Sequence, residues 1–169
     1  MNKLTQYGHP FQTKALAALV TDRDFLQQSA DIVSPEYFDS DASKWIVRKT
    51  LTYFSEYRTT PTMEVFKVET EKIENEVQAV AVKEQLKETY KSSQVKDLAY
   101  IKDTFLDFCK NQTLKNALIR SVDLLELGDY DDIRNLIDKA LKAGVERDLG
   151  HEYIAEVEDR YKEESRYTI

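Results

Sequence analysis

The chain has 169 residues, a formal net charge of −7, and only four glycines and three prolines. So few turn-forming residues exclude the many tight connections of a β-sandwich, a β-barrel or a doubly wound sheet. The longest unbroken apolar run, Ala15–Val20, is too short to span a membrane. One cysteine, Cys109, excludes an internal disulfide and is typical of a reducing compartment. These features predict an all-α protein of the cytoplasm.

Residues 1–92 have the pattern of a small N-terminal helical bundle. Apolar residues recur every three or four positions in short stretches, which proline and helix-capping residues separate. We expect Thr21 and Asn75 to cap helices. Thr60 is expected to cap a further helix, which begins at Pro61. The aromatic residues of this part are predicted to form the core rather than a ligand cage: Phe25, Phe38, Trp45, Phe54 and Phe66.

A long helical hairpin is predicted for residues 93–144. Its first helix, from about Gln94 to Leu127, contains neither proline nor glycine, and its apolar pattern changes phase near the middle. Gly128 ends this helix, and Asp129 caps a second helix. Two helices that are joined by so short a turn lie antiparallel.

The hairpin carries more apolar surface than its two helices can bury against each other. The remainder either contacts another chain, as contiguous exposed apolar patches usually do, or folds back on residues 1–90. We interpret it as a surface for self-association. The residues predicted to form this subunit interface are Leu114, Leu118, Val122, Leu125, Leu136 and Ile137.

The last segment, residues 145–169, is predicted to be a linker helix with a net charge of −4. Its apolar stripe is too narrow for the helix to be stable alone, because isolated short helices are marginal in water. The segment is therefore expected to need a partner surface. The residues predicted to dock there are Tyr153, Ile154, Val157 and Tyr161.

The sequence contains no phosphate-binding loop, no dinucleotide-binding fingerprint and no nucleophile elbow. Its two histidines are far apart, and Cys109 is expected to be a small buried apolar residue. We therefore predict no catalytic, cofactor-binding or metal-binding residue and no enzyme activity for this chain. An enzyme that uses scattered carboxylates is the alternative. The acidic balance predicts that DNA binds only weakly or indirectly, and no membrane partner is expected.

The order of these segments resembles the N-terminal region of DnaB-type replicative DNA helicases. The similarity begins with LAALVTDRDFLQQSADIVSPEYFDSDASKWIVRKTLTYFSEYRTTPT, residues 16–62. The glycine-acidic turn at residues 128–131 is similar to the turn of that family's helical hairpin. The closing stretch GHEYIAEVEDRYKEESRYTI, residues 150–169, is especially similar to the linker of bacteriophage helicases of the T-even type.

The resemblance implies an N-terminal domain for oligomerisation and partner docking in DNA replication. In the family, this region forms a collar on a hexameric ring and a platform for primase and helicase loader, and the linker docks on the neighbouring subunit's motor domain. The resemblance also implies a RecA-like motor domain after Ile169, which would use ATP and Mg²⁺ in the cytoplasm of a bacterial host. The alternative is a stand-alone α-helical phage adaptor or a helicase-loader-like protein.

Overall fold

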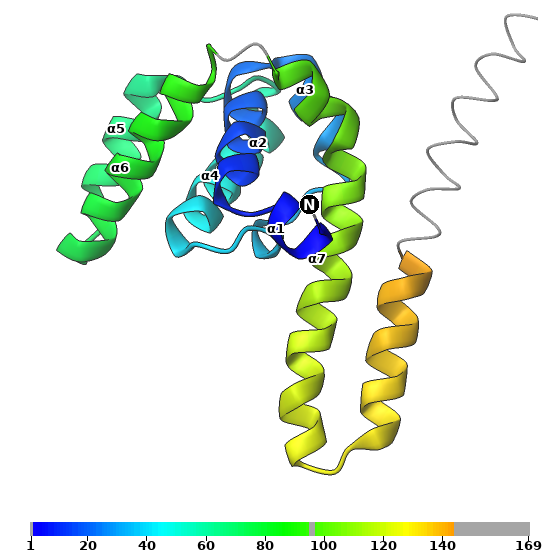
Figure 1. Ribbon diagram of the computed structural model, residues 1–169. Helices are drawn as coiled ribbons and strands as arrows, with labels where there is room; N and C mark the ends of the chain where they lie inside the picture. Colours follow the sequence, from blue (N-terminus) through cyan, green and yellow to red (C-terminus); the bar gives the residue numbers. More distant parts are fainter. Residues whose placement is uncertain (1, 95–96, 144–169) are drawn as a thin grey trace, which may run out of the picture. The chain divides into compact units, whose positions relative to one another are not determined.

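Every regular element in the described part of the chain is helical (Figure 1). The computed structural model describes residues 2–94 and 97–143, and it confirms the all-α fold. No helix in these ranges is long and apolar enough to cross a bilayer. The α-helices are α1 (Lys3–Gln6), α2 (His9–Thr21), α3 (Arg23–Ser29), α4 (Asp41–Tyr57), α5 (Met63–Glu71), α6 (Glu76–Ser92) and α7 (Leu98–Glu126). A 3₁₀ turn, η1 (Pro35–Tyr37), precedes α4, and residues 130–143 are also helical.

The chain divides into two compact units, Met1–Gln112 and Thr113–Ile169. The first unit is built around α2, in which every residue from Phe11 to Val20 except Lys14 is buried. A helix that is buried on nearly all sides lies in the interior of a bundle. The aromatic residues predicted to form the core are indeed buried: Phe25, Phe38, Trp45, Phe54 and Phe66.

The first half of α7 belongs to the core of the first unit. Ile101, Phe105, Phe108 and Cys109 are buried in it, which confirms the interpretation of the cysteine as a small buried residue. The compact first unit therefore extends to residue 112, whereas the sequence pattern assigned residues from 93 onward to the hairpin. The change of phase in the apolar pattern marks this division, because the two halves of α7 serve different units.

The helix starts agree with the sequence at one position and differ from it at two. Asn75 caps α6, and its side chain accepts a hydrogen bond from the backbone N–H three residues on. The prediction for Thr21 is wrong, because its hydroxyl donates to a carbonyl within α2 and Asp22 caps α3 instead. The prediction for Thr60 is also wrong, since Thr62 caps α5 and the proline between them lies outside the helix.

A buried pair of glutamines holds the loop between η1 and α4. Gln12 Nε2 donates to Asp39 Oδ2 at 2.8 Å, and Gln112 Nε2 donates to Asp39 Oδ1 at 3.3 Å. The Asp39 N–H donates in turn to Gln12 Oε1 at 2.9 Å. Both glutamine side chains are buried and therefore require such partners. The loop is thereby tied to α2 on one side and to α7 on the other.

The second unit contains a helical hairpin, which Figure 1 shows as two antiparallel helices. Gly128 has a φ of 74°, in the left-handed region that favours glycine. The Gly128 N–H donates to the Leu125 carbonyl and the Asp129 N–H to the Leu124 carbonyl, both at 3.0 Å. These two bonds form a Schellman motif. The prediction that Gly128 ends the long helix is confirmed.

The Asp22 carboxylate has two structural roles in the first unit. It caps α3 by accepting the Phe25 N–H at 3.1 Å, and it accepts a hydrogen bond from Lys102 of α7. The hydrogen bond from Lys102 is the main reason why the pKa of Asp22 is lowered. A carboxyl with a lowered folded-state pKa stabilises the fold above its unfolded pKa, and this stability is lost as the pH falls through the folded pKa.

We expect Asp22→Asn to lower the free energy of unfolding at neutral pH by up to about 1 kcal/mol, since it keeps a capping acceptor but removes the ion pair. Asp22→Ala also removes the cap and costs roughly 1 kcal/mol more. Urea unfolding followed by circular dichroism, at neutral pH and near about pH 3, measures both effects. The loss of stability on acidification is expected to be smaller in Asp22→Asn than in the wild type. An identical loss in both would contradict the assigned role.

Gly128→Ala is expected to destabilise the hairpin by about 1 kcal/mol, because alanine is strained at a positive φ. No atom lies within 4 Å of the added Cβ, so the cost is conformational rather than steric. Gly128→Asn is the matched control, since asparagine tolerates this conformation better than alanine does. Amide hydrogen exchange over residues 113–143 compares the variants. Equal protection in both would show that the turn does not depend on a left-handed residue.

Candidate interaction surfaces

Three of the predicted interface residues form an exposed apolar line on α7, which we call the hairpin stripe. Leu118, Val122 and Leu125 are spaced by four and three residues and are 53 %, 56 % and 58 % exposed. This spacing places them on one face of the helix. The other three predicted residues are half-buried: Leu114, Leu136 and Ile137.

Further exposed apolar side chains of the hairpin were not predicted from the sequence. They are Ile119, Leu127 and Tyr130. Leu141, which the sequence places on the apolar face of the second hairpin helix, is also exposed. Leu127 and Tyr130 flank the Gly128 turn, and large apolar residues beside an exposed turn are a signal that could have been used. The predicted docking residues of the last segment lie outside the described residues: Tyr153, Ile154, Val157 and Tyr161.

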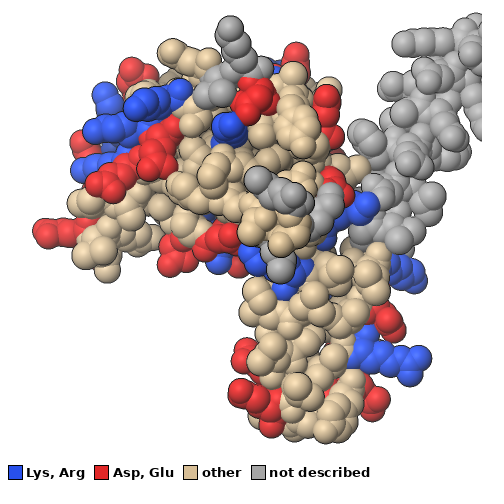
Figure 2. Space-filling model, in the orientation of Figure 1, with Lys and Arg blue, Asp and Glu red and all other residues tan. Residues whose placement is uncertain are grey.

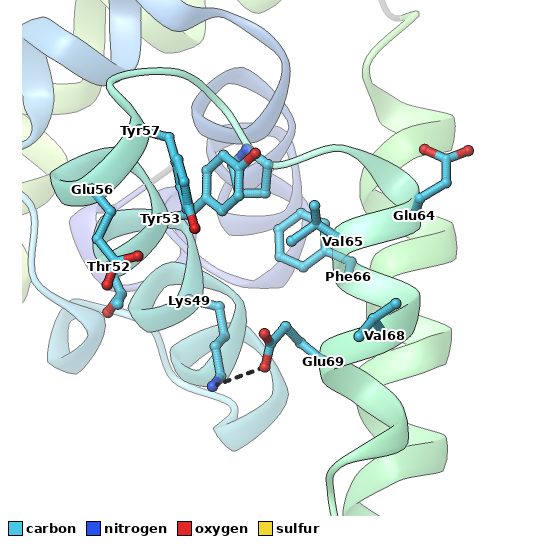
Figure 3. A pocket seen from close by; sticks show the side chains of 11 residues that line it. Lys49, Thr52, Tyr53, Glu56, Tyr57, Glu64, Val65, Phe66, Val68 and Glu69 are labelled. Carbon is cyan, nitrogen blue, oxygen red and sulfur yellow. Dashed lines mark ion pairs between the residues drawn. The ribbon is translucent and has the colours of Figure 1, made fainter.

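A groove of about 460 Å³ lies between α4 and α5 in the first unit (Figure 3). On the α4 side, Tyr53 and Tyr57 pack with their ring centroids 4.5 Å apart, and Tyr57 is 61 % exposed. On the α5 side the apolar residues are Val65, Phe66 and Val68. The groove thus offers tyrosine rings on the α4 wall and both aliphatic and aromatic side chains on the α5 wall.

The rim of the α4–α5 groove is mainly acidic. Glu69 lies between two lysines, at 3.5 Å from Lys49 Nζ and 3.2 Å from Lys72 Nζ. The hydrogen bond from Lys72, aided by the charge of Lys49, lowers the pKa of Glu69. Glu56 and Glu64 also line the groove and form no ion pair with residues that the structure describes. This rim therefore favours a cationic ligand or segment.

A second groove, of about 450 Å³, lies on the other side of α5, between α5 and α6. We call it the lysine groove. Its walls contain three apolar side chains, three lysines, one threonine and one glutamate: Met63, Phe66, Lys67, Thr70, Glu71, Lys83, Leu86 and Lys87. Figure 2 shows a group of basic side chains over this α5–α6 part of the surface, with acidic side chains directly beside it. Neither groove could be predicted from the sequence, because both depend on how neighbouring helices pair.

Within the described ranges, no group of three or more His, Cys, Asp or Glu side chains is placed to hold a metal ion. Comparison with protein-family models, with curated proteins and with solved structures finds no match for the chain. The resemblance to DnaB-type helicases therefore rests on the order of the sequence motifs.

We expect Tyr57→Ala to lower the free energy of unfolding by about 1 kcal/mol or less, because Tyr57 is mostly exposed and loses mainly its contact with Tyr53. Phe54→Ala, one turn earlier on the same helix, removes a buried ring and is expected to cost roughly 3–5 kcal/mol. Chemical denaturation of both variants provides the comparison. A large loss in Tyr57→Ala would show that this ring is core rather than an accessible wall of the groove.

Proposed function

We propose that this chain is an oligomerisation and partner-docking module whose copies associate through the hairpin stripe. The observation that carries the proposal is the exposed line of Leu118, Val122 and Leu125 in the second unit. Apolar side chains that gather on one exposed helix face are typical of protein–protein contacts. Their spacing of three and four residues is that of helix–helix packing, so a helix of a second copy is a suitable partner.

The burial energy available at such a contact falls within the range that association requires. Burying a whole leucine side chain contributes roughly 1.5–3 kcal/mol, and these side chains are about half exposed before association. A two-fold symmetric contact uses the same surface on both copies, so each residue contributes twice. The total is comparable to the lower part of the estimated cost of association, about 4–15 kcal/mol. Ile119, which lies beside the stripe and is also exposed, adds to the apolar area.

At the finer level, we propose that the module is the collar region of a DnaB-type replicative helicase, with primase and loader as partners. The order of motifs along residues 16–169 supports this assignment. The end of the hairpin also carries exposed acidic residues, which disfavour direct contact with phosphate. They are Asp123, Glu126, Asp129, Asp131 and Asp132. The chain is therefore proposed to act on replication through proteins rather than by binding DNA tightly.

Charge substitutions in the hairpin stripe test the proposal. We expect the wild type to show at least twice the monomer mass by light scattering at high concentration, and Leu118→Glu or Val122→Glu to shift it to the monomer. A carboxylate at either position would be buried without a partner in the complex, which is strongly unfavourable. Circular dichroism is expected to show unchanged helicity, because both positions are exposed in the single chain.

Arg120→Glu is the matched control, since it also introduces a carboxylate at an exposed position of the same helix. The spacing of two residues from Leu118 places it on a different face of the helix. This variant is expected to keep the mass of the wild type. A monomeric wild type, or stripe variants that unfold rather than dissociate, would refute self-association through the hairpin.

A further inference from the structure

We infer that the lysine groove between α5 and α6 binds an acidic amphipathic helix of a partner protein. The inference rests on the proposed docking role and assigns a chemistry to the partner. Its apolar side chains would enter the groove, and its aspartate or glutamate residues would face Lys67, Lys83 and Lys87.

The apolar part of the groove consists of Phe66 and Leu86, which are buried, and Met63, which is 40 % exposed. Thr70 also lines it, but its hydroxyl already donates to the Phe66 carbonyl within α5. This part of the groove therefore suits aliphatic side chains better than polar ones. A cavity of about 450 Å³ has the volume of sites that take small apolar groups.

Several lysines of the first unit outside the groove form ion pairs. Lys14 pairs with Asp97 at 2.6 Å and Lys49 with Glu69 at 3.5 Å. The lysines of the groove, in contrast, form no ion pair or hydrogen bond with residues in the described ranges: Lys67, Lys83 and Lys87. Against the single carboxylate of Glu71, they give the groove a local charge of about +2 in a chain of net charge −7. A negatively charged partner satisfies this local excess.

The positions of the lysines favour a partner with acidic residues on both sides of an apolar stripe. Lys83 and Lys87 are four residues apart on α6, next to Leu86, and Lys67 lies on α5 across the groove. An amphipathic helix in an apolar groove inserts residues at positions i, i+3 or i+4, and i+7, and its flanks remain at the rim. Carboxylates on both flanks would then reach lysines of both helices.

Other modes of recognition fit this groove less well. A β-strand ligand needs a free sheet edge, and the described residues of this region are helical. Single-stranded nucleic acid needs exposed aromatic rings on which bases stack, whereas the ring of the groove, Phe66, is buried. Three lysines alone would also hold a nucleic acid only weakly near physiological salt.

Methyl NMR of the full chain provides a direct test, because Met63 lies in the groove and Met1 is the chain's other methionine. The probe is a capped helical peptide of about 18 residues with leucines at i, i+4 and i+7 and glutamates beside them. The control peptide has lysine in place of every glutamate. We expect the acidic peptide to shift the Met63 signal saturably and the lysine peptide to leave it unchanged.

Substitutions on α6 then test the charge contact. The double variant Lys83→Glu/Lys87→Glu is expected to weaken binding of the acidic peptide by about tenfold or more. Lys91→Glu makes the same change on the same helix outside the groove, and its effect is expected to stay within about twofold because salt screens distant charges. If the double variant loses helicity, Lys83→Gln/Lys87→Gln replaces it and is expected to weaken binding less.

Several outcomes would overturn the inference. They are an unshifted Met63 signal at saturating peptide, equal shifts with both peptides, or equal affinity of the double variant and the wild type. An oligothymidylate strand that shifts the same signal and displaces the peptide would assign the groove to nucleic acid instead. Light scattering of the same samples keeps the two proposals separate. Failure of peptide binding with intact self-association refutes only the lysine groove, and peptide binding by a monomeric wild type refutes only the hairpin contact.

Discussion

The packing of rings around Phe108 is the constraint on which the first unit depends. The Phe108 ring lies 5.7 Å from Tyr7, 5.2 Å from Phe11 and 5.4 Å from Phe38, measured between ring centroids. Aromatic pairs at these distances add specific geometry to their burial. They join the start of the chain and the turn before α4 to α7, although these segments are far apart in sequence. One turn later on α7, Gln112 Nε2 donates to the carbonyl of Tyr37 at 2.6 Å. This hydrogen bond adds a polar contact between α7 and the turn before α4.

The helical fold and its core could be predicted from the sequence, because apolar periodicity directly reflects which side of a helix is buried. The exact helix starts could not, since Thr21 and Asp22, or Thr60 and Thr62, are acceptors of the same class. Tertiary contacts decide which of two nearby residues caps the helix. Asp22, for example, also accepts a hydrogen bond from Lys102, which is 80 residues away in sequence. No local pattern contains that information.

The candidate surfaces were predictable only where one helix was sufficient to define them. All three residues of the hairpin stripe, Leu118, Val122 and Leu125, lie on α7. Their spacing of four and three residues therefore predicts one apolar helix face from the sequence alone. The lysine groove needs side chains of two helices, and Lys67 has no sequence relation to Lys83 that marks them as neighbours. Met63, at the start of α5, is 40 % exposed at this groove.

Helix α5 separates two grooves of opposite charge, and it is held to the bundle by few buried residues. Of its nine residues only Phe66 and Thr70 are buried, and the Phe66 side chain lines both grooves. A short helix with so little buried area belongs to the parts of a fold that open most easily. A ligand in either groove would bury more of α5 and would stabilise the bound state by mass action. Phe66 is common to both grooves, so its buried ring forms part of the wall of each. The two grooves thus share one side chain while the charges at their rims differ, with carboxylates prevailing on the α4 side and lysines on the α6 side.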